Sequence, residues 1–147
     1  MEPEVSSTDC EFCEIVRGAT PARVVWETVA MMAFFPLRPA ALGHTLVIPK
    51  AHVPDFLALK EDLVGLLAVS VAHVGRALNR ALQPDGMNAI TSAGEAASQS
   101  VFHLHVHLVP RWEHDDIGEI WPPSQPMSSM LENTLADLVQ REAAGAW

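Results

Sequence analysis

The chain has 147 residues, 49% of them apolar and 18% charged, which is enough for one sizeable core and argues against a wholly disordered chain. Nine Lys and Arg oppose 18 Asp and Glu, and a net charge of -9 argues against binding to the backbone of DNA or RNA. Met1 to Asp9 is polar and acidic, unlike a secretory signal, and the longest apolar stretch, Val29 to Leu37, is too short to cross a membrane. We therefore expect a cytoplasmic protein that binds neither nucleic acid nor membrane.

Short apolar stretches separated by turn residues predict five strands. These stretches are Val24 to Trp26, Val29 to Phe35, Thr45 to Ile48, Met87 to Thr91 and Val101 to Val109, which Pro110 closes.

Two segments have helical periodicity instead. From Glu61 to Leu82 apolar residues recur at i, i+3 and i+4, and the turn sequence Gln83 to Gly86 ends the helix. A second helix is expected from Ser128 to Ala144, after an irregular, Pro-rich loop over Glu113 to Pro126. The pattern predicts an α+β domain over residues 1–147: an antiparallel sheet of about five strands with a long helix and a C-terminal helix packed on one face.

Both cysteines, Cys10 and Cys13, lie in one C-x-x-C sequence. A disulfide across two intervening residues constrains little of the unfolded chain, so it would be a weak cross-link. In a cytosolic protein this spacing favours half of a metal site or a redox pair over two unrelated thiols.

The stretch Val101 to Val109 carries three of the chain's seven histidines, His103, His105 and His107, at alternate positions. On a strand these side chains share one face, roughly 7 Å apart, while Leu104, Val106 and Leu108 point into the core. Such a row could chelate zinc. Alternatively, it could supply a nucleophile, an acid and a base, because the pKa of imidazole lies near neutrality.

The segment just before this row favours the second chemistry. Ser92 to Gln99 contains no bulky side chain, and its glycine and serines suit backbone N–H groups and hydroxyls closing round a phosphate. A plain flexible connection is the alternative.

Gln99 to Val109 closely resembles the signature of the histidine-triad (HIT) family, His-φ-His-φ-His-φ-φ with φ apolar. Gly43 to Val53 is similar to the family's second conserved block, and Glu11 to Val16 is similar to its opening. The resemblance covers roughly Cys10 to Trp112 and leaves the loop and helix over 113–147 unmatched. Two long blocks in the right order make it specific.

The resemblance implies a homodimer and a nucleotidyl hydrolase or transferase. The substrates would be nucleoside phosphoramidates or dinucleoside polyphosphates, purine derivatives among them. His105 would attack the α-phosphorus and form a nucleotidyl-histidine, with His103 and His107 as the other catalytic histidines. Substrate contacts would come from the following residues: Ser92, Ser98, Gln99, Ser100, Phe34 and Leu37.

Cys10, Cys13, His52 and His103 match the zinc ligands of a bacterial-type branch of the family. Two thiolates and two imidazoles form a closed tetrahedral set, which predicts structural zinc. In branches without zinc, the histidines that match His52 and His103 belong to a hydrogen-bonded chain behind the nucleophile. That alternative stays open, although the two cysteines favour zinc.

Two positions depart from the family pattern. Pro36 stands where many members carry an aspartate that holds the ribose hydroxyls, and Ser92 stands where an asparagine is usual. Both departures bear on which nucleotide is recognised, and neither touches the triad. Besides turnover through His105, two functions are therefore considered: a zinc-stabilised nucleotide-binding module with little turnover, and a zinc hydrolase with the triad as its ligands.

The predicted homodimer also has support in the long helix. Its apolar face is wider than one stripe, and a helix this broadly apolar in a small domain needs a second surface to cover it. The residues that widen it are Val64, Leu67, Ala68, Val71, Ala72 and Val74. The alternative is that the C-terminal helix covers this face within one chain.

Overall fold

The computed structural model describes residues 9–145 and divides the chain into two compact units, Met1–Asp115 and Asp116–Trp147. Met1 to Thr8, on which the expectation about secretion mainly rested, lie outside the described residues. None of the helices formed by residues 9–145 has the length and apolar character needed to cross a membrane.

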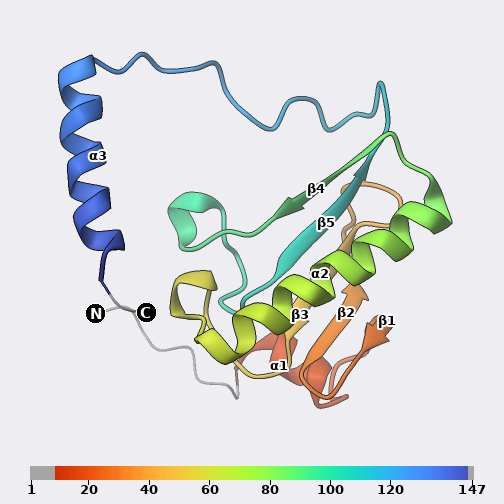
Figure 1. Cartoon of the computed structure of the whole chain (residues 1–147). Helices are drawn as coiled ribbons and strands as arrows, with labels where there is room; N and C mark the ends of the chain where they lie inside the picture. The colour runs from red at the N-terminus through yellow and green to blue at the C-terminus, as the bar shows by residue number, and fades with distance from the viewer. Residues whose placement is uncertain (1–8, 146–147) are drawn as a thin grey trace. The chain divides into compact units, whose positions relative to one another are not determined.

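The first unit is built on one five-stranded antiparallel sheet with the order β1-β2-β3-β5-β4, so the predicted α+β class is confirmed (Figure 1). The strands are β1 Arg23–Glu27, β2 Met31–Phe35, β3 Thr45–Pro49, β4 Gly86–Ile90 and β5 Val106–Arg111. Strands β2, β3 and β5 are almost entirely buried, because each has a neighbour on both sides and a packed layer on both faces.

Helix α2, Glu61–Leu82, has the predicted bounds and covers one face of the sheet. Leu67 and Val74 of α2 pack against a core that includes Ala33, Val47 and Leu108. They are buried, so they do not widen its exposed surface as the sequence suggested; Leu66 and Val69, which are 49% and 68% exposed, do so instead.

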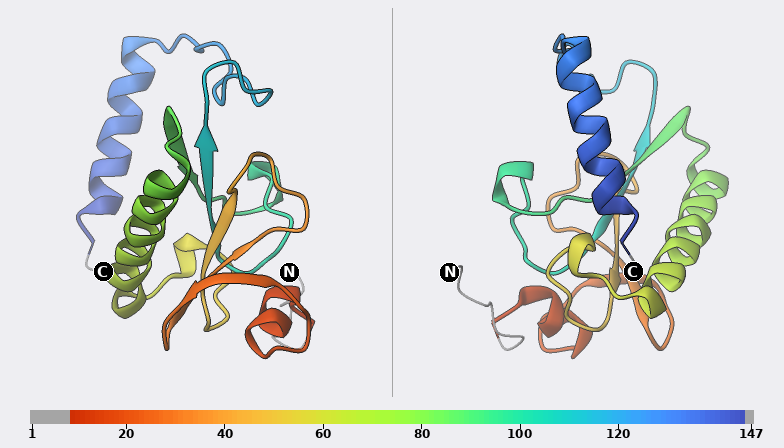
Figure 2. Two further views of the ribbon diagram at one scale, coloured as in Figure 1. Left: turned by 90° about the vertical axis from the view of Figure 1, so that its right-hand side faces the viewer. Right: turned by 60° about the vertical axis from the view of Figure 1, so that its left-hand side comes forward.

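A short helix that the sequence did not predict, α1 (Glu11–Val16), packs on the face of the sheet opposite α2 (Figure 2). Phe12 and Cys13 of α1 pack there with Phe34, Leu46 and Ile48. Six residues are too few to show an amphipathic period, which is why the pattern gave no signal. Two features stabilise the start of this helix. The Sγ of Cys10 accepts a hydrogen bond from the Cys13 amide, and the acidic residues Glu11 and Glu14 lie in the first turn.

Two 3-10 helices, η1 Phe56–Ala58 and η2 Glu95–Ala97, complete the first unit. The second unit contains helix α3, Ser129–Ala143, close to the predicted range. The hydroxyl of Ser128 caps it by accepting from the Leu131 amide.

The predicted strand over Val101 to Val109 is wrong at both ends, since β5 begins at Val106 and continues through Pro110 to Arg111. The ladder with β3 ends at Val47 and Val106, two residues before Pro49, which has no N–H to donate. On the other side the Thr91 hydroxyl donates to the His105 carbonyl at 2.8 Å, just beyond the end of β4. His103 and His105 therefore precede the strand, and only His107 lies on it.

Gly43 offers a test of how closely α2 packs on the sheet. Its φ is +75°, and a Cβ there would collide with the side chain of Leu82. We expect Gly43→Ala to lower the free energy of unfolding by about 1–3 kcal/mol, through strain and overpacking together. Urea unfolding measures this change. Gly75→Ala, in the helical backbone of α2 with only an ordinary contact to Met87, should be neutral or mildly stabilising. Equal losses in both variants would contradict the argument.

Candidate functional site

One ring nitrogen of His105 is hydrogen-bonded to the backbone, and the other has a free electron pair in the neutral ring. Its Nδ1 lies 2.7 Å from the carbonyl oxygen of His103, and a carbonyl only accepts, so Nδ1 carries the proton and donates. In the neutral ring Nε2 is then unprotonated. The side chain is 9% exposed and precedes β5 by one residue. This tautomer is the one that a nitrogen nucleophile needs.

His107 lies beside His105, with ring centroids 4.8 Å apart, and its tautomer is set by a hydrogen-bonded chain. The Ala40 amide donates to Nδ1 of His44 at 2.9 Å, so the proton of neutral His44 is on Nε2. That Nε2 donates to Nδ1 of His107, also at 2.9 Å. Neutral His107 therefore carries its proton on Nε2 and is a donor there.

Burial favours the neutral forms of His44 and His107. The pKa of His107 is lowered to about 4, first by burial and then by the charges that His105 and His44 would carry. Burial also lowers the pKa of His44. At pH 7 the chain from Ala40 to His107 is therefore a set of neutral donors and acceptors, which is the condition for the tautomers derived above.

The third histidine of the triad turns away from this pair. The ring of His103 is fully buried against both thiols, with Nδ1 at 3.4 Å from Cys10 Sγ and 3.5 Å from Cys13 Sγ. The expected row of three adjacent imidazoles is thus a pair plus a separate histidine. The predicted division of faces holds, since Leu104, Val106 and Leu108 all belong to the core beneath α2.

Cys10, Cys13, His52 and His103 form one group, here called the Cys2His2 cluster, whose ligand atoms all lie within 4.8 Å of one another. Nδ1 of His52 is 3.3 Å from Cys13 Sγ. A tetrahedral zinc with ordinary bond lengths separates S and N ligands by about 3.5 Å, so these distances fit such an ion. The sequence therefore named a set of residues that the fold does bring together.

The donor chemistry of the cluster also fits a metal. His103 donates from Nε2 to the Pro49 carbonyl at 2.8 Å, which leaves the Nδ1 electron pair facing the thiols. Burial lowers the pKa of His103 to about 4, so the ligand nitrogen is unprotonated at pH 7. Burial, reinforced by Cys10, raises the pKa of the Cys13 thiol to about 11 when no cation is present. A bound cation removes that obstacle, because it stabilises the thiolate directly.

The predicted phosphate loop is more closed than its composition suggested. The amides of Ala97, Ser98 and Gln99 donate to carbonyls within the loop, and the Gly94 amide donates to Oε1 of Gln99. These four amides are not available to a phosphate, so the expected cradle of backbone N–H groups is reduced. Ser92 is partly exposed and Ser98 and Ser100 are exposed, which leaves their hydroxyls accessible.

Gln99 itself is buried and fully engaged. Its Nε2 donates to the carbonyls of Pro54 and Val101, and its Oε1 accepts from Gly94. Gln99 therefore ties the loop to the segment after β3. These bonds support a positioning role, and the predicted direct substrate contact remains a prediction.

The two apolar substrate contacts named from the sequence have different surroundings. Phe34 is 2% exposed and packs edge-to-face on Phe12, with centroids 5.4 Å apart. Leu37 is 94% exposed, next to Pro36 beyond the end of β2. Only Leu37 is open to a ligand in this structure.

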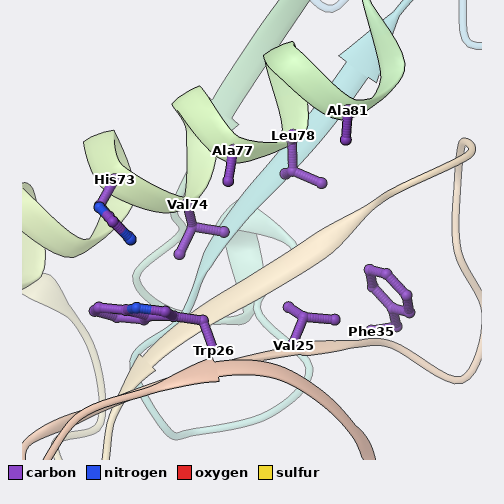
Figure 3. Close-up of a pocket in the computed structure, with 8 residues that line it drawn as sticks. All are labelled: Val25, Trp26, Phe35, His73, Val74, Ala77, Leu78 and Ala81. Atoms are coloured by element: carbon purple, nitrogen blue, oxygen red, sulfur yellow. The ribbon is translucent and has the colours of Figure 1, made fainter.

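An apolar groove of about 200 Å³ lies on the α2 face of the sheet, away from the histidines of the triad (Figure 3). Val25, Trp26 and Phe35 form one wall, and residues of α2 from His73 to Ala81 form the other. The rings of Trp26 and His73 are 5.1 Å apart. Because the reactive histidines lie on the opposite face, this groove is not the substrate site proposed below.

Sequence reasoning missed His44, Thr91 and Phe12, three residues that fix the site. His44 stands inside the block Gly43 to Val53, and its place in that block was the available signal. Phe12 likewise stands inside the block Glu11 to Val16. Thr91 carried no signal, because its role depends on a contact with the backbone of His105 across the fold.

The lowered pKa of His107 gives a prediction about stability. Between about pH 6.5 and 4 the imidazole of His107 is protonated in the unfolded chain but neutral in the folded protein. The free energy of unfolding should therefore fall as the pH drops through this window and level off below it. Urea unfolding at several pH values should show a shallower slope for His107→Gln than for the original chain. Gln125→Asn, an exposed substitution that changes no titratable group, serves as the control and should leave the slope unchanged; identical slopes in all three proteins would contradict the assignment.

Comparisons with known proteins identify the family of this chain. The HIT domain model matches residues 17–114. The chain is 32% identical to adenosine 5'-monophosphoramidase hnt1 of Schizosaccharomyces pombe, over 81% of this chain and 86% of that protein. SMU.412c of Streptococcus mutans is 38% identical, with a TM-score of 0.87 over 95% of this chain and 88% of its own. A Zn-bound histidine triad family protein of Mycobacterium smegmatis is 35% identical, with a TM-score of 0.72 over 95% and 100% of the two chains. The chain therefore belongs to the HIT domain family.

Proposed function

We propose that this protein is a nucleotidyl hydrolase or transferase in which Nε2 of His105 attacks the α-phosphorus of a nucleoside phosphoramidate or dinucleoside polyphosphate. The observation that carries the proposal is the hydrogen bond from Nδ1 of His105 to the His103 carbonyl. In the neutral ring it leaves Nε2 with a free electron pair, on a residue that is nine-tenths buried. The name of the yeast relative, a monophosphoramidase, supports the reaction class.

The reaction has two steps. In the first, an Nε2–P bond forms and the bond from phosphorus to the leaving amine or phosphate breaks, with the leaving atom taking one proton. In the second, water or another acceptor forms a bond to phosphorus, the Nε2–P bond breaks and one proton is released, so His105 is regenerated. The Nδ1–H bond to His103 stabilises the positive charge on the substituted imidazole in between.

The other histidine of the pair donates to the phosphoryl group. His107 presents Nε2–H because His44 occupies its Nδ1, so it can stabilise negative charge developing on a phosphoryl oxygen. Ser100 is the proposed hydroxyl donor toward the phosphate or leaving group, with Ser92 and Ser98 beside it in the loop. We propose purine nucleoside phosphate derivatives as the substrate class, with Leu37 near the nucleoside.

A nucleotide-binding module with little turnover is the second candidate. Pro36 in place of the usual aspartate, Ser92 in place of asparagine, and the loop amides already used within the loop all favour altered recognition. The two functions differ in whether a covalent nucleotide forms on His105.

Replacing the nucleophile tests this directly. We expect His105→Ala to lower hydrolysis of a nucleoside phosphoramidate by several orders of magnitude while nucleotide binding persists, because the step that His105 supplies is covalent. Steady-state kinetics and calorimetric titration with the nucleoside monophosphate measure the two effects. Mass spectrometry of quenched reactions should find the nucleotidyl adduct on His105. Near-normal turnover in His105→Ala would refute the mechanism, and binding without any adduct or turnover in the unaltered chain would favour the second candidate.

We further propose that the Cys2His2 cluster holds one structural zinc. The tetrahedral spacing of its ligand atoms and the Zn-bound relative support zinc over a hydrogen-bonded chain of histidines. Zinc would supply folding free energy by tying α1 to the sheet. A zinc hydrolase that uses the triad as ligands is disfavoured, because His105 and His107 are not in the ligand group found among residues 9–145.

Metal analysis of the purified protein should find one zinc per chain. We expect chelation or Cys13→Ser to lower the melting temperature, because the metal binds the folded chain and the unfolded chain only weakly. Ser124→Ala, at an exposed position outside the cluster, is a suitable mock substitution. Protein without zinc, with both thiols open to titration and an unchanged melting temperature, would eliminate the site.

The protein is also proposed to be a homodimer through α2. Leu66 and Val69 are apolar side chains left exposed on this helix, and the apolar groove of Figure 3 runs along its flank. Two copies related by a two-fold axis would bury both.

Light scattering at micromolar concentration should therefore give twice the chain mass. Val69→Asp should halve that mass with little loss of monomer stability, because Val69 is exposed in the single chain. A charge at Val74 would instead disrupt the core of each copy, so it is the less informative variant. A fully active monomer would refute the dimer.

A further inference from the structure

Helix α1 links the Cys2His2 cluster to the nucleophile. It starts immediately after Cys10, contains Cys13, and carries Phe12 between them. Phe12 is 5% exposed, so its ring is held inside the unit. The two ligand positions therefore flank a buried aromatic side chain.

The ring of Phe12 contacts the rings of both His103 and His105. Its centroid lies 5.9 Å from that of His103, at an interplanar angle of 66°, and 5.3 Å from that of His105, at 88°. Both contacts are edge-to-face, an arrangement that aromatic pairs favour. The nucleophile thus has the His103 carbonyl on its Nδ1, the ring of His107 on one side and the ring of Phe12 on another.

The position of α1 is not determined by the helix itself. A six-residue helix is far below the length at which helices are stable alone in water, so attachments to the rest of the fold must hold it. Those attachments include the packing of Phe12 on Phe34. They also include the thiols of Cys10 and Cys13, which face His103 and His52. A metal bound by all four ligands would join α1, the segment after β3 and the triad at one point.

We propose that the Cys2His2 cluster, when it holds its metal, positions the nucleophile through α1, with Phe12 as the positioning residue that restrains the ring of His105. Two connections run from the cluster to His105: the backbone of His103, whose carbonyl fixes the Nδ1–H tautomer, and the ring of Phe12. The kinetic part of this inference rests on the proposed function of His105, whereas the structural part concerns the ring alone.

The first experiment substitutes Phe12→Leu, with Phe56→Leu on the exposed 3-10 helix η1 as the matched control. Nitrogen-15 NMR of the imidazoles at pH 7 reports the tautomer of His105 directly. In the zinc-loaded original chain and in Phe56→Leu, His105 should show a single Nδ1–H tautomer. In Phe12→Leu it should show a mixture, and kcat should fall about 10- to 100-fold with KM little changed. Zinc content, measured alongside, should stay at one per chain.

The second experiment substitutes His52→Ala, because the ring of His52 contacts His103 and Cys13. Zinc should be lost, and the folded protein should show the same mixed tautomer at His105 as Phe12→Leu. His73→Ala is its matched control and should retain both zinc and the single tautomer.

The outcomes separate the inference from the proposed function. A single Nδ1–H tautomer that persists in both Phe12→Leu and His52→Ala overturns the inference, whatever the turnover. An original chain without turnover refutes the proposed function, yet a tautomer that becomes mixed in both variants still supports the coupling of the cluster to His105. If Phe12→Leu fails to fold, the tautomer in folded His52→Ala decides, since that variant keeps Phe12.

Discussion

The buried imidazole of His103 is the constraint on which the rest of the site depends. Its Nε2 donates to Pro49, its Nδ1 faces the two thiols, and its backbone carbonyl accepts from His105. One fully buried residue therefore fixes the end of β3, one corner of the Cys2His2 cluster and the tautomer of the nucleophile. Satisfied polar groups at this depth act as a rigid connection, because any movement would leave a buried donor or acceptor without a partner.

His105 and His107 lie on either side of the point where the pairing of β5 with β3 begins. Pro49 has no N–H with which to continue the ladder between β3 and β5. Thr91 holds the His105 carbonyl with its hydroxyl rather than with its backbone. His105 thus leaves the regular pleat while His107 remains in it. This break allows the two rings to approach to 4.8 Å, closer than the roughly 7 Å expected for alternate residues on one strand.

The electrostatics of the site show how an acidic chain could accept the proposed anionic substrate. The net charge of -9 gives no general attraction for phosphate. Burial lowers the pKa of His44, His103 and His107, so these rings are neutral. His44 and His103 use their N–H groups on His107 and Pro49, which leaves the Nε2–H of His107 as the oriented donor. In the proposed reaction, a donor that is already oriented would need no reorganisation.

Local patterns identified much of this molecule. The period of Glu61–Leu82 gave α2 with its bounds. The short apolar stretches placed four strands within two residues of their observed ends and placed the fifth too early along the chain. The motif spacing and the resemblance together named the four members of the Cys2His2 cluster, although Cys10 and His103 are 93 positions apart in the chain. These features are readable because a repeat, a turn residue or a conserved block lies within a short window of sequence.

The sequence alone determined which segments form the long helix and the sheet, and it predicted which residues carry the chemistry. The tertiary structure decided how those residues face one another. It showed that α1 packs on the face opposite α2, that His103 leaves the triad for the thiols, and that His44 and Phe12 hold the reactive pair. Each of these depends on contacts between segments distant in the chain. Local periodicity carries no information about such contacts, because they are set by packing and by the need to satisfy buried polar groups.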